Sequence, residues 1–224
     1  MLENKVVVFV GAGTPAGKVL VDRFAQAGAT IIAIFATMDE AYENFPQHVE
    51  GWVLSADLAE ESEATACFQK IGAQFGRIDV LVHMVQETER RPIERTSFEE
   101  WDRVIRQNMT TAFLSFRESV RQMQNGYGRL IALVGQQGAD KARTQQAAYA
   151  ASQAGIIRLV EATAAEYAKM DIGAFAVAQS ILLTDQQGKH GVQASDVADL
   201  CIQLCTPAGK ALSGAVLRAY GSII

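Results

Sequence analysis

The stretch that decides the fold is residues 5–18, KVVVFVGAGTPAGK. Its apolar run, Val6–Val10, has no polar alternation, which predicts a strand buried on both faces in a parallel sheet covered by helices. A glycine-rich turn follows, and apolar residues then recur at helical spacing. Glycines at such a turn let phosphates approach the backbone, and the helix N-terminus offers free N–H groups. The stretch therefore predicts a strand, turn and helix of the nucleotide-binding kind.

The turn fits the dinucleotide-binding pattern G-x-G-x-x-G/A over residues 11–16. A Walker phosphate loop fits less well, because Ala12 and Val19 stand where that motif requires a glycine and a hydroxyl. We expect Thr14 to cap the helix and Pro15 to begin it. Pro15 also lacks an N–H and places its ring where a pyrophosphate would approach, so a working dinucleotide site stays a hypothesis.

Size and composition bound the class of protein. The chain has 224 residues, so we expect a single domain over residues 1–224. The net charge of −5 argues against nucleic acid or an anionic membrane as the main partner. No apolar run is long enough to span a bilayer and the N-terminus shows no signal-peptide pattern, so we expect a cytoplasmic protein. The three cysteines and three histidines show no ligand spacing, so we expect no metal site.

Strands and helices alternate along the chain. The predicted strands are 6–10, 30–36, 52–54, 78–85, 129–134, 175–178 and 215–219. Helices are predicted near 60–75, 98–123 and 146–170, with a shorter one at 197–205. This order predicts a single-domain, Rossmann-like α/β fold, with a doubly wound sheet of about seven mostly parallel strands and helices on both faces. Asp39 and Glu40, just past the second strand, are interpreted as a solvated helix start.

With this order, the chain resembles the short-chain dehydrogenase/reductase family over essentially its whole length. The matching stretches are VGAGTPAGK at 10–18, Asp57-Leu58, Ile78–Val82, Trp101–Asn108 and Tyr149–Gln153. The resemblance implies NAD or NADP as cofactor, although the sequence leaves open which of them binds, or whether either does. The cofactor-binding residues that it implies are Gly11, Gly13, Thr14, Gly17, Asp57 and Leu58.

In that family a tyrosine transfers the proton, and a lysine one helical turn on lowers the tyrosine's pKa and holds the cofactor ribose. A serine bonds the substrate oxygen and an asparagine positions a water. By resemblance Tyr149 and Asn108 are the candidate catalytic residues, in vestigial or altered form, because the lysine position holds Gln153 and the serine position holds Gly135. Glutamine carries no charge to stabilise a phenolate. A phenol near its reference pKa of about 10 is a poor base at neutral pH.

The cofactor side departs from the family as well. Residues 83–86 read HMVQ where the family has N-N-A-G, and Gln179-Ser180 replace a P-G pair. We therefore favour a protein that lacks normal dehydrogenase or reductase turnover and keeps the fold for assembly or for ligand and nucleotide binding. The alternative is an NAD(P)-dependent oxidoreductase acting on a carbonyl or alcohol with Tyr149 as acid/base. A lyase or isomerase that uses His83 or Gln136-Gln137 is a third hypothesis without positive support.

Assembly follows from the same resemblance. Members of the family usually dimerise through two long helices, which match residues 98–123 and 146–170. We therefore expect a homodimer or homotetramer formed through these helices, and an intact relative of the family is a second candidate partner.

Overall fold

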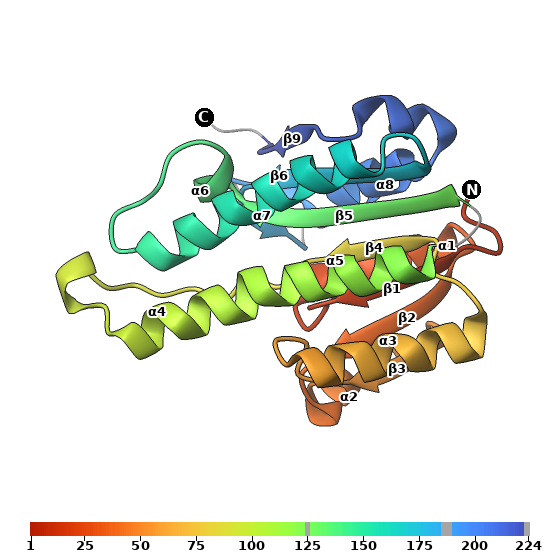
Figure 1. The fold of residues 1–224 in the computed structure, drawn as a ribbon, viewed down its shortest axis with the longest axis horizontal. Helices are drawn as coiled ribbons and strands as arrows, with labels where there is room; N and C mark the ends of the chain where they lie inside the picture. The colour runs from red at the N-terminus through yellow and green to blue at the C-terminus, as the bar shows by residue number, and fades with distance from the viewer. Residues whose placement is uncertain (124–125, 185–189, 222–224) are drawn as a thin grey trace.

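The computed structural model describes residues 1–123, 126–184 and 190–221. A seven-stranded sheet forms its centre, with every pairing parallel and the order β3-β2-β1-β4-β5-β6-β9 (Figure 1). The strands are β1 (Val6–Val10), β2 (Thr30–Phe35), β3 (Gly51–Ser55), β4 (Val80–His83), β5 (Tyr127–Gly135), β6 (Asp171–Gln179) and β9 (Val216–Ala219). Two short strands, β7 (Leu182–Leu183) and β8 (Val192–Gln193), pair separately. The prediction of a doubly wound sheet of about seven strands is confirmed.

Helices cover both faces of the sheet. One face packs on α1 (Pro15–Gln26) and α8 (Ala194–Leu204), and the other packs on α3 (Glu61–Phe75), α5 (Thr111–Gln122) and α7 (Ala147–Glu166). Figure 1 shows the second group in front of the sheet. The strands alternate between these two cores: Val80 and Val82 face α1, whereas Leu81 faces the α5 side. This double burial explains why β1 and β4 carry no polar alternation.

The long helix predicted over 98–123 consists of three consecutive parts. These are α4 (Phe98–Ile105), a π-helical turn η2 (Arg106–Thr110) and α5. The helix predicted over 146–170 is α7, which ends at Glu166. Three further short helices are α2 (Met38–Asn44), α6 (Gln136–Ala139) and η1 (Ile93–Arg95), and the 3-10 helix η4 (Pro207–Leu212) precedes β9.

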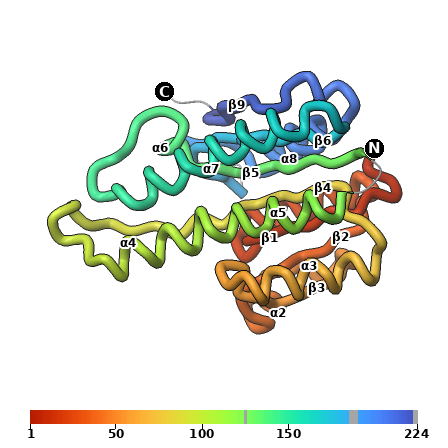
Figure 2. Tube along the Cα trace, in the orientation of Figure 1, coloured from red at the N-terminus to blue at the C-terminus, as the bar shows by residue number. Residues whose placement is uncertain are grey.

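The carboxyl end of the sheet carries the longest projections. Figure 2 shows α4 and the segment between α6 and α7 extending past the ends of the strands on that side. In open parallel sheets, ligands bind in the crevice outside the carboxyl ends of the strands. The fold therefore brings the ends of β1, β4, β5 and β6 together as the place to look for a site. No helix in the described part of the chain is long and apolar enough to cross a membrane.

Candidate functional site

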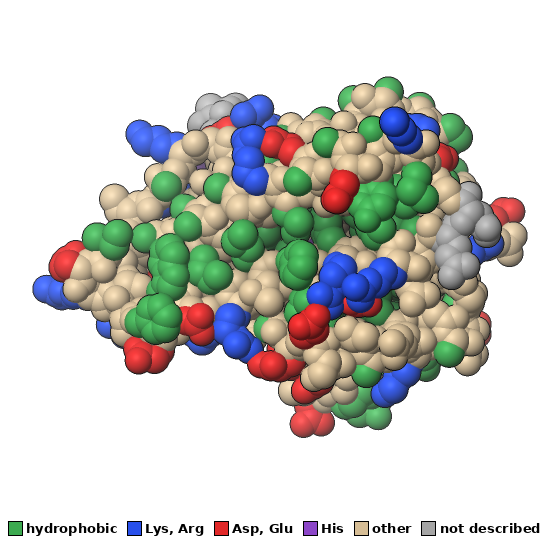
Figure 3. Space-filling view, viewed as in Figure 1, with side chains coloured by type: hydrophobic (Ala, Val, Ile, Leu, Met, Phe, Trp, Pro, Cys, Tyr) green, Lys and Arg blue, Asp and Glu red, His purple; other side chains and the backbone are tan. Residues whose placement is uncertain are grey.

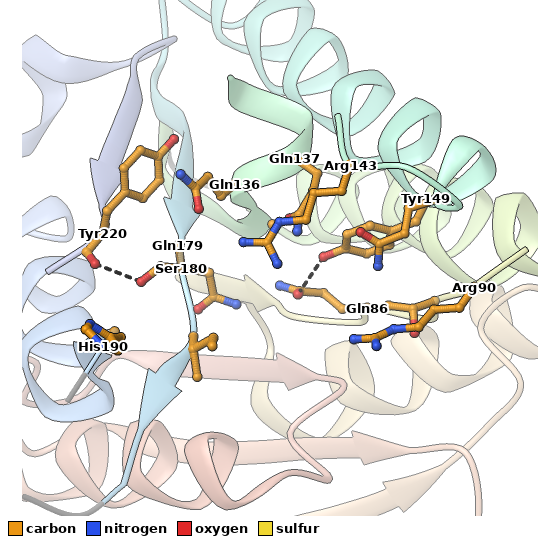
Figure 4. A pocket seen from close by; sticks show the side chains of 15 residues that line it. Gln86, Arg90, Gln136, Gln137, Arg143, Tyr149, Gln179, Ser180, His190 and Tyr220 are labelled. Carbon is orange, nitrogen blue, oxygen red and sulfur yellow. Dashed lines mark hydrogen bonds between the residues drawn. The ribbon is translucent and has the colours of Figure 1, made fainter. Parts of the chain in front are cut away.

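A cavity of about 410 Å³ lies at the carboxyl ends of β4, β5 and β6 (Figure 4). Its wall includes residues after β4, the α6 turn, the start of α7 and Tyr220 after β9. Tyr149 and Gly135, two of the positions singled out from the sequence, line this cavity. The structure thus brings the candidate tyrosine and the serine-equivalent position into one pocket.

Tyr149 is held by a glutamine. Its side chain is buried, and its hydroxyl donates a 3.0 Å hydrogen bond to Oε1 of Gln86. Burial raises the pKa of Tyr149 to about 12, and the nearby Arg143 guanidinium opposes that rise only in part. The phenol is therefore protonated throughout the physiological pH range.

Because Gly135 has no side chain, the hydroxyl of Tyr149 can lie directly against its backbone. A β-carbon built on Gly135 would overlap the Tyr149 hydroxyl oxygen and lie 3.1 Å from Oε1 of Gln137. With the backbone in this conformation, a serine side chain at position 135 would overlap the Tyr149 hydroxyl. The glycine at the serine position and the placement of Tyr149 are therefore linked features.

Gln153 faces the backbone instead of the cavity. Its side chain is fully buried, and Oε1 accepts a 2.8 Å hydrogen bond from the Gly135 N–H. Gly138 of α6 packs directly on it, since a β-carbon there would lie 2.5 Å from the Gln153 β-carbon. Nε2 of Gln153 has no hydrogen-bond partner within the described residues. The residue at the lysine position therefore supplies a structural hydrogen bond and no charge.

Asn108 fixes the loop that carries Gln86. It is fully buried in the π-helical turn η2. Its Oδ1 accepts from the Glu87 N–H at 2.7 Å, and its Nδ2 donates to the Glu87 carbonyl oxygen at 2.8 Å and to Ser152 Oγ at 2.9 Å. Because both the oxygen and the nitrogen of its side-chain amide are hydrogen-bonded, Asn108 joins η2, α7 and the loop after β4. The loop then places Gln86 against the Tyr149 hydroxyl.

The sequence analysis missed Glu89. This buried carboxylate accepts hydrogen bonds from the backbone N–H of Ala148 at 2.7 Å and of Tyr149 at 3.1 Å, so it caps the start of α7 from a distant loop. A carboxylate at a helix N-terminus also interacts favourably with the helix dipole. The high charge density of residues 86–95 was the one sequence signal, and it could not show that one of these acids turns inward.

The glycine-rich turn adopts the conformation expected of it. Thr14 caps α1 by accepting from the Gly17 N–H at 3.0 Å, and Pro15 is the first helical residue. Gly11 has φ of +82°, and a β-carbon there would lie 2.7 Å from a Val85 methyl group. At Gly17 a β-carbon would overlap the Ala12 carbonyl oxygen. The turn thus needs glycine at both positions for the backbone to close.

Two further cavities flank this turn. One, of about 350 Å³, is lined by Gly11, Phe35, Asp57 and Leu58 among others. The other, of about 500 Å³, includes Gly11, Gly13, Thr14 and Gln86 and runs toward β6. The structure therefore brings five of the six predicted cofactor-binding residues to the walls of one crevice. Gly17 is buried beneath the turn and contributes to its shape.

Glu40 lies between these two cavities and lines both of them. It belongs to α2, whose Thr37 cap confirms the predicted helix start. The expectation that its side chain is simply solvated needs correction, because Oε2 accepts from the Ala36 N–H at 3.1 Å and Oε1 lies directly over Gly13. The first cavity suits an adenosine group, with apolar walls and Asp57 at its side. A carboxylate over the glycine turn disfavours a diphosphate there, so the residues fit the adenosine half of a dinucleotide better than its diphosphate.

His83 lies outside these cavities. It ends β4, is fully buried, and neither ring nitrogen has a hydrogen-bond partner in the described parts of the chain. Desolvation lowers the pKa of His83 to about 4. It therefore gives no support to a lyase or isomerase that uses this histidine.

Comparisons with known proteins agree with the geometry. Residues 5–194 match the sequence profile of the short chain dehydrogenases. The chain is 30% identical over 208 residues to a 3-oxoacyl-(acyl-carrier-protein) reductase of Thermotoga maritima, covering 88% of this chain and 82% of that one. It is 32% identical over 179 residues to an acetoacetyl-CoA reductase of an Acinetobacter strain, covering 77% and 72%.

The fold has close counterparts among solved structures. The crystal structure of levodione reductase superposes with a TM-score of 0.89 at 20% identity, covering 99% of this chain and 98% of that chain. This likeness concerns the fold alone, whereas the sequence match spans the turn after β1, the loop after β4 and the first turns of α7. From the family match over most of its length, the chain belongs to the short-chain dehydrogenase/reductase family.

Proposed function

We propose that this protein binds small molecules in the crevice at the carboxyl end of its sheet without the dehydrogenase turnover of its family. The observation that carries the proposal is the position of Gln153, which is buried with its amide oxygen on the Gly135 N–H. The two groups that would assist Tyr149, a cation one helical turn on and a hydroxyl at position 135, are both replaced. Tyr149 and Asn108 then serve as binding and positioning residues.

The proton chemistry argues in the same direction. With a pKa of about 12, only about one Tyr149 phenol in 100,000 is ionised at pH 7. General acid–base catalysis is most efficient when the pKa lies near the operating pH. A phenol so poorly matched, with a glutamine as its hydrogen-bond partner, makes a good ligand-binding group and a poor base.

An NAD(P)-dependent oxidoreductase is the second candidate function. It is favoured by the Tyr149 hydroxyl, which lines the 410 Å³ cavity and has an acceptor in Gln86. In this case Tyr149 would exchange a proton with a carbonyl or alcohol substrate, and the crevice lined by Asp57, Leu58 and the glycine turn would hold the cofactor. The names of the relatives, reductases of acyl substrates, agree with this class.

Cofactor binding and turnover are tested separately. Thermal melting with NADH or NADPH reports binding, since a ligand at a hundred times its dissociation constant stabilises the folded state by about 2.7 kcal/mol. Cofactor oxidation over a panel of carbonyls reports turnover, with Tyr149→Phe as the matched control. We expect binding of a nucleotide and a rate equal to that of the control. Reduction that depends on the Tyr149 hydroxyl would overturn the proposal in favour of the second candidate.

Assembly is part of the same proposal. We infer that two copies associate through α4, α5 and α7, with an intact family member as an alternative partner. Figure 3 shows apolar side chains gathered over these helices. Exposed large apolar residues there include Trp101, Met109 and Phe113. Met109 packs on Gly155 of α7, where a β-carbon would lie 2.8 Å from its sulfur atom, so the two helices form one continuous surface.

A further inference from the structure

Two arginines that line the 410 Å³ cavity, Arg90 and Arg143, have no carboxylate partner within the described residues. The other eleven of the thirteen arginines in the chain each form an ion pair with an aspartate or glutamate. Arginine is always protonated in proteins, so the two guanidinium groups bring two permanent positive charges to the cavity. Among the described residues, both arginines without a carboxylate partner therefore lie at this one cavity.

Both arginines are exposed residues that line the cavity. In the view of Figure 4 the guanidinium groups of Arg143 and Arg90 lie above and below the Gln86 side chain, near Tyr149. Arg143 is close enough to Tyr149 to act on its pKa against the effect of burial. No aspartate or glutamate among the described residues lines the cavity. A planar guanidinium fork is suited to a carboxylate, which it can bind with two parallel hydrogen bonds.

The remaining polar wall calls for hydrogen-bond donors. Five glutamines line the cavity: Gln86, Gln136, Gln137, Gln146 and Gln179. Gln146 and Gln179 are 9% and 8% exposed, and Oε1 of each is buried with no partner among the described residues. Buried acceptors without a donor are costly, so turning either amide oxygen toward the cavity, where a ligand hydroxyl can donate to it, is favourable.

We propose that this cavity binds a small hydroxylated organic acid, with its carboxylate at Arg90 and Arg143 and its hydroxyl groups donating to Gln146 and Gln179. The inference rests on the proposed ligand-binding function and names its ligand class. A volume of about 410 Å³ falls within the range of small-molecule sites. The Tyr149 hydroxyl opens on the same space, and because it donates its proton to Gln86, its oxygen offers the ligand a hydrogen-bond acceptor.

Matched pairs of acid and alcohol test the ligand class. The acids are D-glycerate, L-threonate and D-gluconate, and their counterparts glycerol, threitol and glucitol carry the same kind of hydroxylated chain without a carboxylate. Isothermal titration calorimetry at millimolar concentration, with and without NADH, measures each affinity. We expect at least one acid to bind and its alcohol to bind at least about tenfold more weakly, the loss expected of a charge-assisted hydrogen bond. Equal affinity of acid and alcohol, or binding of no acid, would overturn the inference.

Variants then test the residues. Arg143→Gln and Arg90→Gln should each weaken the acid by about tenfold, and Gln179→Leu should weaken the acid and alcohol alike, because it removes an acceptor for hydroxyl groups. Arg91→Gln is the control, because Arg91 neighbours Arg90 in sequence but pairs with Glu100 at 2.5 Å. An Arg91→Gln effect as large as that of Arg90→Gln would show that only net charge matters, and would refute the site.

The same measurements separate this inference from the proposed function. If NADH binds and no acid does, the ligand class is wrong while nucleotide binding stands. If an acid binds and is also turned over with NAD or NADH in a Tyr149-dependent manner, the ligand class stands while the proposal of a protein without turnover fails.

Discussion

At the scale of single residues, Gly135 and Tyr149 occupy one space. The Tyr149 hydroxyl lies where the side chain of residue 135 would be, and it bonds Gln86 there. Reintroducing a side chain at 135 therefore forces Tyr149 to move before any catalytic benefit of a serine can appear. The same overlap makes the two positions energetically coupled.

We predict that Gly135→Ala lowers the free energy of unfolding by about 1–3 kcal/mol, the usual cost of overpacking a core. In a Tyr149→Phe background the overlapping oxygen is gone, so the same substitution should cost less. Urea denaturation of the four proteins in this cycle gives the coupling. Identical costs in both backgrounds would show that Gly135 and Tyr149 do not compete for space.

Glu40, also at the residue scale, predicts a preference between NADH and NADPH. Its carboxylate lines both cavities beside the glycine turn, so in the proposed binding mode it would repel the additional phosphate that NADPH carries on its adenosine. We expect NADH to bind at least about fivefold more tightly than NADPH, and Glu40→Gln to remove most of this difference. Fluorescence titration measures both affinities.

Asp39→Asn is the control for this charge change, because Asp39 is exposed and lines neither cavity. It should leave the ratio of the two affinities within about twofold. A loss of preference in the Asp39 variant, or its persistence in the Glu40 variant, would assign cofactor choice to the overall charge of α2 instead.

The sequence could identify residues that the structure brings together at the candidate site, but not their geometry. Gly11, Thr14, Asp57 and Tyr149 stand in motifs with fixed spacing, so the chain order was enough to place them. The contact of Glu40 with the glycine turn was not predicted, because Glu40 reaches Gly13, which lies 27 residues earlier. Such a contact depends on tertiary structure. That Arg90 and Arg143 alone among the arginines have no carboxylate partner in the described residues depends on tertiary contacts, which the sequence does not give.

At the scale of elements, α7 depends on a cap that lies far away in sequence. Glu89 receives the Ala148 and Tyr149 N–H groups, so the loop after β4 fixes the first turn of the helix that carries Tyr149. We predict that Glu89→Ala lowers the free energy of unfolding by about 1–3 kcal/mol, because two buried donors lose their acceptor. Denaturant unfolding measures this cost.

Glu94→Ala serves as the comparison, because Glu94 is exposed in the nearby short helix η1 and makes only a 3.9 Å ion pair with Arg95. Its cost should stay below about 0.5 kcal/mol. If the two variants were equally stable, the hydrogen bonds to Glu89 would not stabilise α7.

Hydrophobic periodicity was enough to predict which segments form helices and which form strands, but it did not predict two local features. The π-helical turn at Arg106–Thr110 interrupts a pattern that reads as one continuous helix, and it orients Asn108 toward Glu87. The α6 turn follows β5 directly and covers Gln153. Both features are set by packing against α7, which a one-dimensional pattern does not contain.

At the scale of the whole molecule, the apolar stripe of Trp101, Met109 and Phe113 on α4, η2 and α5 predicts association. We expect wild-type protein to be a dimer or larger at micromolar concentration by light scattering. Phe113→Asp should weaken the dimer by at least about tenfold, since it places a charge at the centre of an apolar interface. Tyr42→Asp, which changes a 73% exposed aromatic residue on α2, should leave the mass unchanged. A wild-type monomer would contradict the inferred assembly.

His83 should contribute to the pH dependence of the free energy of unfolding of the whole fold. Its ring is fully buried at the end of the central strand β4, and burial lowers its pKa from 6.5 to about 4. Between these pH values the unfolded chain binds a proton at His83 that the folded chain does not. The free energy of unfolding should therefore fall by about 3 kcal/mol as the pH drops from 6.5 to 4, and this term should be flat above pH 6.5.

The measurement that checks His83 is urea denaturation at a series of pH values, in wild type and in His83→Leu. Because leucine binds no proton, the variant should lose the His83 part of the acid destabilisation. Its free energy of unfolding should therefore change less between pH 6.5 and pH 4 than that of wild type. If wild type and His83→Leu gave the same slope, the buried ring would be accepting its proton without unfolding, and a polar path from β4 to solvent would have to exist.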